Sequence, residues 1–351
     1  MTSVTAASDA CKAPIPEMLK RSYPGECHAI YTIRLSIVID GYIMAKPLTP
    51  ALDAEQFAVT LDGNVTLRGY QGEVLEGTPL VLLHSINAAP SAMEIRPLFE
   101  HYRDKRPVMA PDLPGFGLSD RPAVSYSSAQ YAQWIAEWLK AFHSPPDVVA
   151  LSLTGEFVAR AILEQGTRIR SLTLISPTGM GTASPPSLPS GSRLDRVLNS
   201  PWVGKSLFRA LTTKASIRWF LNKAFVGPTP EYLVQYAWET ARQPGAHLVP
   251  LKFLTFRLFT EQAMSRLYSR LTLPCLVLYD DDPNIGFERL SELADSNDQW
   301  TIKRLVPSMG LPHWELPADT IKALDDFWGL SAEDAALSDD VAEQSARRQS
   351  A

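Results

Sequence analysis

The chain has 351 residues, of which 45% are hydrophobic, 20% charged and 9% aromatic. This is the composition of an ordinary globular protein, and it excludes a wholly disordered, collagen-like or coiled-coil chain. The 33 basic and 38 acidic residues give a net charge of −5, and because no basic patch stands out we expect no nucleic-acid partner. Three scattered cysteines are too few for a disulfide framework. Their odd count fits a reducing compartment, so we expect a cytoplasmic protein.

Residues 1–55 form a predicted N-terminal leader. Its most apolar stretch, Ala29 to Ala45, contains Arg34 and Asp40, and both charges are costly at the centre of a bilayer. The stretch also begins late and lacks a small-residue cleavage pattern, so we predict neither a membrane span nor a cleaved signal. Two interpretations stay open: the leader packs on the domain, or residues 29–45 make peripheral contact with a membrane.

From about Phe57 onward, short β-rich runs alternate with helical patterns. This alternation predicts an α/β fold with a mostly parallel central sheet flanked by helices. A hairpin turn signal at residues 62–64 separates the first two runs, Phe57–Thr60 and Val65–Arg68. The later runs are apolar almost throughout, as expected for strands buried on both faces. They cover residues 79–84, 107–111, 147–152, 171–175 and 274–279, and a further predicted strand follows at residues 300–305.

Three helices are predicted around these strands. Apolar residues recur at helical spacing from Tyr131 to Phe142, and a capping box begins at Ser127. A second helix, Thr154–Gln165, begins directly after the strand that ends at Ser152, with almost no loop between them. The last helix is predicted over Pro317–Trp328.

The alternation of strands and helices stops in one long segment. Residues 181–272 are helical in pattern and rich in aromatic side chains, which predicts a helical insertion that divides the α/β core into residues 56–180 and 273–330. Residues 331–351 are small and acidic, and we expect a disordered tail there.

The junction at Ser152 carries the main chemical signal. The segment 150–155 reads Ala-Leu-Ser-Leu-Thr-Gly, so a serine stands at the tip of a buried strand and a helix follows at once. Such a turn lifts the hydroxyl clear of the sheet and directs the unpaired N–H groups of the helix N-terminus at the same point. The segment resembles the nucleophile elbow of the α/β-hydrolase fold superfamily, which includes serine esterases and lipases.

Three further segments resemble that superfamily. His84-Ser85-Ile86-Asn87 is similar to its oxyanion loop, and residues 111–120 are similar to its Asp-x-x-Gly-x-Gly-x-Ser turn. Residues 280–283 (Asp-Asp-Asp-Pro) and 311–315 (Leu-Pro-His-Trp-Glu) are similar to its acid and histidine loops. Ser152, Asp282 and His313 occur in the superfamily's order.

The resemblance implies a role for each of these residues. Ser152 would be the nucleophile, and His313 would accept its proton and return it to the leaving group. Asp282, chosen from the three adjacent acids because it precedes Pro283, would orient His313. The backbone N–H groups of Ile86 and Leu153 would form the oxyanion hole.

The sequence departs from the superfamily's pattern at four positions where glycine is usual. These positions hold Ala150, Thr154, Ser85 and Tyr279. None of the replacements removes a reacting group. The β-branched Thr154 must nevertheless find room beside the strand tip, and the side chain of Ser85 could narrow the oxyanion loop. A specialised substrate, or a fold kept for binding, therefore stays open.

The expected function is hydrolysis of an ester of a hydrophobic acyl or ring substrate through an acyl-enzyme. The inserted segment would act as a cap, and it also resembles those of pheophytinase-like hydrolases, which implies a large hydrophobic ester. The alternatives are hydrolysis of a C–C bond or acyl transfer by the same triad, and a catalytically silent binding protein. We expect no cofactor and no metal, because there is neither a Gly-rich phosphate loop nor Cys/His ligand spacing. The oligomeric state stays open.

Overall fold

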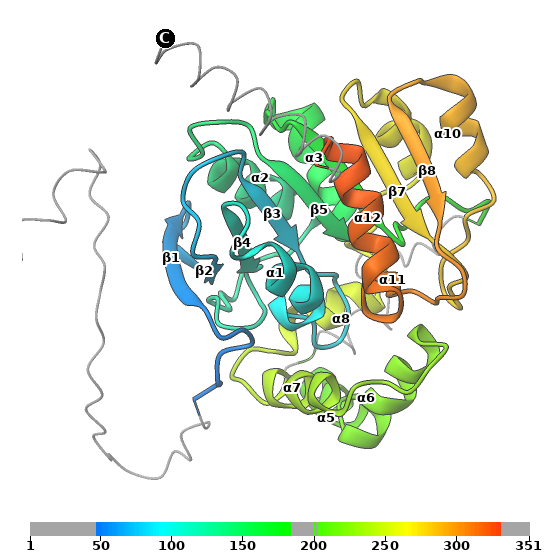
Figure 1. The fold of residues 1–351 in the computed structure, drawn as a ribbon. Coiled ribbons are helices and arrows are strands. Elements are labelled where there is room, and N and C mark those ends of the chain that lie inside the picture. Colours follow the sequence, from blue (N-terminus) through cyan, green and yellow to red (C-terminus); the bar gives the residue numbers. More distant parts are fainter. Residues whose placement is uncertain (1–46, 184–199, 201–202, 331–351) are drawn as a thin grey trace, which may run out of the picture. The chain divides into compact units, whose positions relative to one another are not determined.

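The computed structural model describes residues 47–183, 200 and 203–330 and contains one eight-stranded sheet (Figure 1). Its spatial order is β1-β2-β4-β3-β5-β6-β7-β8. β2 pairs antiparallel with both β1 and β4, and every other neighbouring pair is parallel, which confirms the predicted fold class. The strands are β1 (Glu55–Leu61), β2 (Val65–Gln71), β3 (Leu80–Leu83), β4 (Val108–Asp112), β5 (Asp147–Leu151), β6 (Ser171–Ile175), β7 (Cys275–Tyr279) and β8 (Trp300–Arg304).

From β3 onward, helices separate and follow the strands along the chain. The α-helices are α1 (Arg96–Tyr102), α2 (Ser128–Leu139), α3 (Thr154–Gln165), α5 (Val203–Leu211), α6 (Lys214–Leu221), α7 (Glu231–Ala241), α8 (Leu248–Leu254), α9 (Ala263–Arg266), α10 (Leu290–Ser296), α11 (Pro312–Glu315) and α12 (Pro317–Trp328). Short 3₁₀ helices are η2 (Ala92–Ile95), η3 (Asn222–Ala224) and η4 (Tyr268–Arg270).

The sheet is buried between two layers of helices. Alternate residues of β5 face opposite sides, as the two-residue period of a strand requires: Ala150 packs in one core cluster with Phe157 of α3, and Leu151 packs in the other with Leu324 of α12. In Figure 1, α1 and α12 lie in front of the sheet and α2 and α3 lie behind it. This double cover explains the nearly continuous apolar runs of the parallel strands.

Helix α2 begins where the capping box predicts but ends earlier than predicted. The Ser127 hydroxyl accepts the N–H of Gln130 at 3.1 Å, so the expected cap is present. The helix ends at Leu139, however, and the extension of the helical pattern to Phe142 was wrong. The Phe142 ring lies beyond the last turn and packs on Trp138, with ring centroids 5.3 Å apart, so it keeps an apolar contact without being helical.

Helices α5 to α9 follow β6 and precede β7 in the chain. Figure 1 shows α5, α6 and α7 grouped beyond the end of the sheet to which the parallel strands point, and we call α5 to α8 the cap helices. Residues 1–46, which include the apolar stretch 29–45, lie outside the described residues, as does the tail 331–351. Within the part that the structure describes, no helix is long and apolar enough to cross a membrane.

Candidate active site

Ser152 occupies a strained turn between β5 and α3. Its φ of 51° lies in the left-handed region, which L-residues rarely adopt and which is found preferentially at functional sites. The backbone is held on both sides: the Ser152 N–H donates to the carbonyl of Ile175 at 2.9 Å, and its carbonyl accepts the N–H of Gly155 at 3.1 Å. The half-buried serine therefore stands at the carboxyl edge of the sheet, at the N-terminus of α3.

Thr154 and Ala150 fit the turn where glycine is usual. Both are fully buried, and the Thr154 hydroxyl donates to the carbonyl of His84 at 2.7 Å. The extra side chain therefore links the Ser152 turn to the predicted oxyanion loop.

The loop that follows β3 is fixed by internal hydrogen bonds. Nε2 of His84 accepts the N–H of Leu113 at 2.9 Å, so Nδ1 carries the proton and donates to the carbonyl of Ser85 at 2.6 Å. Burial lowers the pKa of His84 to about 4, which keeps the ring neutral. The Ser85 hydroxyl accepts the side-chain amide of Asn87 at 2.8 Å. His84 thus shapes the loop, and the Ser85 side chain is bonded within it.

Two buried N–H groups lack acceptors beside this turn. Among the described residues, no acceptor meets the backbone N–H of Ile86 or of Leu153. Buried N–H groups are nearly always paired, so these two are open to an oxygen supplied by a ligand.

Asp112, the last residue of β4, links η2 to the turn that follows β4. The Asp112 carboxylate accepts the N–H groups of Ala92 and Leu118, both at 2.8 Å, and burial raises its pKa to about 6. Gly117 has a φ of +47°, and a Cβ there would lie 1.9 Å from Cγ of Asp112. Only glycine fits this turn, which explains the Gly-rich motif.

Glu94 of η2 was missed by the sequence analysis and lies at the centre of the site. Its buried carboxylate accepts the N–H of Ser85 at 2.9 Å and the amide of Asn87 at 2.7 Å. Its backbone carbonyl accepts Nε2 of His313 at 2.7 Å and Nε1 of Trp314 at 2.6 Å. Burial raises the pKa of its carboxyl. The available signal was an acid inside the apolar run of residues 92–95.

His313 lies in α11 and is fully buried. Because its Nε2 meets a carbonyl, which can only accept, Nε2 carries the proton and Nδ1 holds the lone pair. Nδ1 has no hydrogen-bond partner in the described part of the chain. Burial lowers the pKa of the ring to about 4, so at neutral pH it is uncharged, as a general base must be.

Asp282 keeps one carboxylate oxygen free. Its Oδ1 accepts the N–H groups of Asn284 at 2.7 Å and Ile285 at 3.0 Å, and burial raises its pKa. Its Oδ2 has no hydrogen bond to the described residues, and it faces Gly310, where a Cβ would approach it to 2.5 Å. Gly310 stands three residues before His313 in the chain.

Asp280 has a structural role. One of its oxygens accepts Nε of Arg304 at 2.7 Å, and the other accepts the N–H of Ser308 at 2.8 Å. With both oxygens occupied, Asp280 holds the loop before α11 in place, and its neighbour Asp282 is the carboxylate with an oxygen to offer.

The structure connects the predicted site residues indirectly. No hydrogen bond joins the side chains of Ser152, Asp282 and His313 within the described ranges. Instead, contacts run from His313 to Glu94, from Glu94 to the oxyanion loop, and from that loop to Thr154 beside the serine. The segments that follow β3, β5 and β8 are thereby tied to one another.

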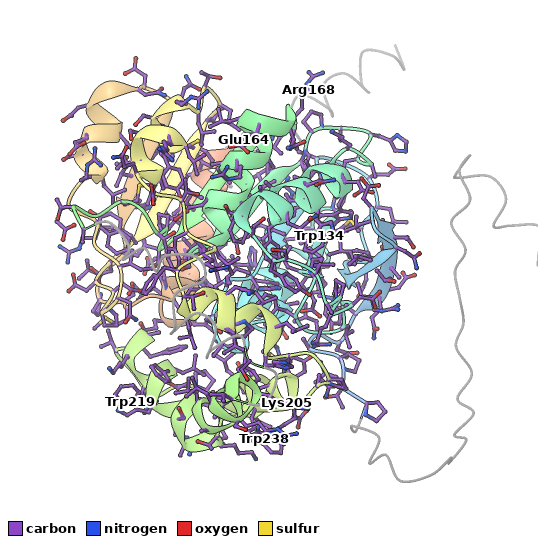
Figure 2. The ribbon with its side chains drawn as sticks, turned by 180° about the vertical axis from the view of Figure 1, so that it is seen from behind. Trp134, Glu164, Arg168, Lys205, Trp219 and Trp238 are labelled. Carbon is purple, nitrogen blue, oxygen red and sulfur yellow. The ribbon has the colours of Figure 1, made fainter. Side chains whose placement is uncertain are left out.

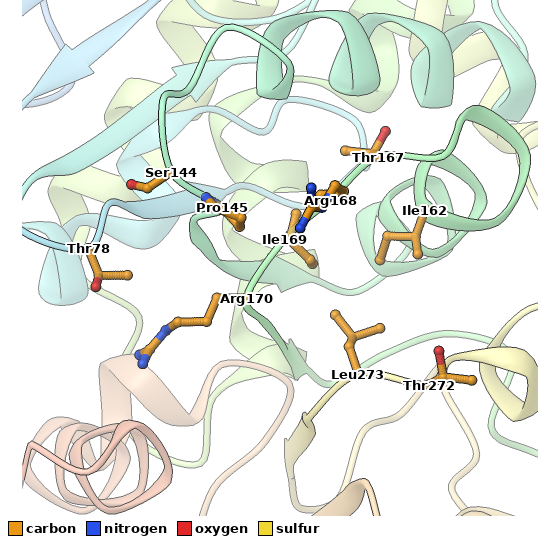
Figure 3. Close-up of a pocket in the computed structure, with 10 residues that line it drawn as sticks. All are labelled: Thr78, Ser144, Pro145, Ile162, Thr167, Arg168, Ile169, Arg170, Thr272 and Leu273. Carbon is orange, nitrogen blue, oxygen red and sulfur yellow. The ribbon is translucent and has the colours of Figure 1, made fainter.

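A cavity of about 440 Å³ lies elsewhere (Figure 3). Thr78, Pro145 and Arg170, which precede β3, β5 and β6, are part of its lining. It therefore stands at the amino ends of the strands, opposite Ser152. The described residues hold no cluster of three or more His, Cys, Asp or Glu side chains that could bind a metal ion.

Comparison with known proteins identifies the family. The model of the alpha/beta hydrolase family matches residues 80–323, and the chain belongs to this family. The solved structures that it resembles include the meta-cleavage product hydrolase CumD of Pseudomonas fluorescens IP01 (TM-score 0.61, 16% identity, 78% of this chain and 97% of that one). They also include the esterase EaEST of Exiguobacterium antarcticum (TM-score 0.61, 14% identity, 77% and 98%). At these identities the likeness concerns the fold.

Two curated relatives share part of the sequence. They are the rat and mouse proteins named 1-acylglycerol-3-phosphate O-acyltransferase ABHD5, each 34% identical over 107 residues. The match covers 29% of this chain and 30% of each relative, so the chain matches less than a third of their length.

Proposed function

We propose that this protein is a serine hydrolase that cleaves an ester through Ser152, forming an acyl-enzyme that water then hydrolyses. The observation that carries the proposal is the strained Ser152 turn beside the N–H groups of Ile86 and Leu153, for which the described residues supply no acceptor. The tetrahedral intermediate develops a negative oxygen that needs such fixed donors. Losing one donor typically raises the barrier by about 3 to 4 kcal/mol.

His313 and Asp282 complete the proposed machinery. His313 takes the proton of Ser152 during attack and gives it to the leaving group. For this step the ring leaves the Glu94 carbonyl, and exchange with water moves its single proton from Nε2 to Nδ1. Nε2 then accepts the proton of Ser152, and the Nδ1 N–H donates to Oδ2 of Asp282, so that the two atoms without a partner among the described residues pair with each other.

The proposed substrate is an ester with a hydrophobic acyl chain or ring system. The segment between β6 and β7 supports this choice, because it supplies many of the chain's aromatic side chains and stands beyond the strand ends where α/β sheets bind ligands. We keep the cytoplasmic location as a prediction.

Two other functions have specific observations in their favour. Names among the similar proteins include a C–C bond-cleaving class of hydrolase and an acyltransferase, and both chemistries could use the same three residues. A silent binding protein is favoured by the contact of His313 with Glu94, which leaves the three residues unconnected. Product analysis with an ester and an alcohol acceptor separates hydrolysis from transfer.

The proposal is tested by labelling the purified full chain with a fluorophosphonate probe. We expect covalent modification of Ser152 that is absent in Ser152→Ala and strongly reduced in His313→Ala, because the hydroxyl is a weak nucleophile without its base. A folded wild-type protein that is not labelled would exclude an activated serine and leave the binding protein.

The acid is tested in the same preparation with a matched pair of variants. Asp282→Asn should lower turnover by about 10³- to 10⁴-fold if it orients His313, with little change in stability. Asp280→Asn should instead lower stability, since both of its oxygens are bonded. The opposite pattern would assign the role to Asp280.

A further inference from the structure

The cap helices expose the large aromatic side chains that the rest of the described molecule buries. Trp219 and Phe220 of α6 and Tyr232 of α7 are 55%, 53% and 48% exposed, and within the described residues no other aromatic side chain of Phe, Trp or Tyr type is classed as exposed. Val203 and Val226 of the same region are 47% and 57% exposed. A group of exposed apolar side chains of this size marks an interaction surface.

Helix α6 buries few of its apolar side chains. Ile217 is its only buried residue, whereas the rings of Trp219 and Phe220 pack edge to face on each other with centroids 4.7 Å apart. The helix therefore turns Ile217 and the half-buried Leu221 inward and two aromatic rings outward. The two exposed rings are not needed to pack the cap helices against one another.

The same region is strongly basic. Residues 203–254 contain seven basic and two acidic side chains, a net charge of +5, on a chain whose total charge is −5. Nζ of Lys223 lies 3.7 Å from the ring centroid of Trp219, and Nζ of Lys214 lies 4.7 Å from that of Trp238. The basic residues are Lys205, Arg209, Lys214, Arg218, Lys223, Arg242 and Lys252.

The charges and the rings lie at one end of the molecule. Figure 2 shows Trp219, Lys205 and Trp238 together on the end formed by α5, α6 and α7. Exposed tryptophan and phenylalanine interleaved with lysine and arginine are the composition of helices that lie in the interface of a bilayer. The cations meet anionic headgroups there, and the rings enter the boundary with the acyl chains.

We propose that this surface, formed by Lys205, Lys214, Trp219, Phe220, Lys223 and Val226, docks the protein on membranes that carry anionic lipids. The orientation places the cap helices against the bilayer, so an apolar molecule dissolved in the membrane would meet the cap first. The docking stands independently of Ser152 chemistry, because none of these residues belongs to the proposed catalytic machinery.

The test is flotation of the full chain with vesicles of phosphatidylcholine, with and without phosphatidylserine. We expect binding to the phosphatidylserine vesicles that weakens as salt is raised, and much weaker binding to phosphatidylcholine alone. The variant Trp219→Ala/Phe220→Ala should lose at least about tenfold in affinity, and Lys205→Gln/Lys223→Gln should lose the salt-sensitive part. Circular dichroism checks that each variant is folded.

A matched control removes exposed apolar side chains away from the cap. Leu75 and Leu330 are 76% and 46% exposed, and Leu75→Ala/Leu330→Ala should bind like the wild type. Unchanged binding of the Trp219/Phe220 variant would move the contact to another surface, such as residues 29–45, and overturn the proposal. Absence of binding by the wild type would overturn the lipid assignment in favour of an acidic protein partner.

Discussion

The Ser152 turn is held by a side chain at a position where the family commonly has glycine. Thr154 is bulkier than the glycine that the family commonly has at this position. Its hydroxyl, however, donates a hydrogen bond to the His84 carbonyl at 2.7 Å. The substitution therefore exchanges backbone freedom for a fixed distance between the serine and the oxyanion loop. We infer that this site is less adaptable than one built on glycine.

His313 gives a prediction for the pH dependence of catalysis. Burial lowers the pKa of its ring to about 4 from an ordinary value of 6.5, and a general base must be unprotonated. The profile of kcat/KM, which reports the free enzyme, should therefore stay flat as pH falls through 6.5 and decline only as it approaches about 4.

The measurement is kcat/KM for an ester substrate from about pH 4, the pKa of the His313 ring, upward. The free energy of unfolding is monitored over the same pH range. An acid limb near the ordinary histidine pKa would contradict the burial of the ring in the free protein. A control with Glu292→Gln on the surface of α10 should leave the profile unchanged, because the exposed Glu292 side chain forms its ion pair with Arg289, away from His313.

At the scale of elements, the short helix η2 joins two parts of the site. Its residue Glu94 contacts the loop after β3 through the carboxylate and α11 through the carbonyl. Residues 94 and 313 are 219 positions apart, so the predicted oxyanion loop and His313 are coupled through a single residue. Glu94 is thus a positioning residue in the proposed hydrolase.

The variant Glu94→Ala should lower kcat more than it raises KM. Without the carboxylate, the N–H of Ser85 and the amide of Asn87 lose their acceptor, and the adjacent N–H of Ile86 is no longer fixed. A lost oxyanion donor corresponds to about 10²- to 10³-fold in kcat, and we expect a loss of at least about tenfold here. Glu94→Gln keeps one acceptor oxygen and should recover part of the rate.

Glu100→Ala on α1 is the control, since Glu100 forms only an exposed pair with Arg96. The comparison uses steady-state kinetics and the rate of fluorophosphonate labelling. Equal losses in Glu94→Ala and Glu100→Ala, or a change confined to KM, would exclude the positioning role.

Elements with strong local signals were predictable from the sequence. The strand β6 and the helices α3 and α12 have the predicted bounds, because apolar runs and periodic faces determine them locally. The Glu94 contacts were not predictable, because they join segments distant in sequence and depend on packing. The position of the Ser152 turn could be predicted from the strand before it and the helix after it. The hydrogen bond from His313 to a backbone carbonyl could not be predicted, because any buried carbonyl can accept the ring N–H.

At the scale of the whole molecule, buried ionisable groups act on stability in opposite directions. His84 and His313 have pKa values lowered to about 4, so they favour the folded state increasingly as pH rises toward 6.5. Asp112 and Glu156 have pKa values raised to about 6 and about 7, so they favour it less as pH rises. In the pH dependence of the free energy of unfolding, the contributions of the two histidines and of the two carboxyl groups therefore partly cancel.

Glu156 isolates one of these contributions. It lies in the first turn of α3, its Oε2 accepts the N–H of Thr260 at 2.7 Å, and burial raises its pKa to about 7 from 4.5. The folded protein keeps this proton where the unfolded chain has released it. The stability it confers is thus full below the unfolded pKa and is lost as pH rises through about 7.

Glu156→Gln should therefore gain free energy of unfolding relative to the wild type as pH rises from about 5 to 8, by up to about 3 kcal/mol. Urea unfolding of both proteins across this range measures the difference. Glu164→Gln at the exposed end of the same helix should show no such trend. A constant difference between Glu156→Gln and the wild type would mean that Glu156 is already ionised near pH 5.

The position of the cap helices between β6 and β7 has a consequence for how this chain can change. Leu172 of β6 pairs with Cys275 of β7, so the sheet is closed across a connection of about a hundred residues. The entropy of closing such a loop grows only logarithmically, and doubling its length costs about 0.6 kcal/mol. Residues can therefore be added, removed or exchanged in this connection at little expense to the sheet, and the surface offered to the surroundings can evolve while the chemistry beneath it stays in place.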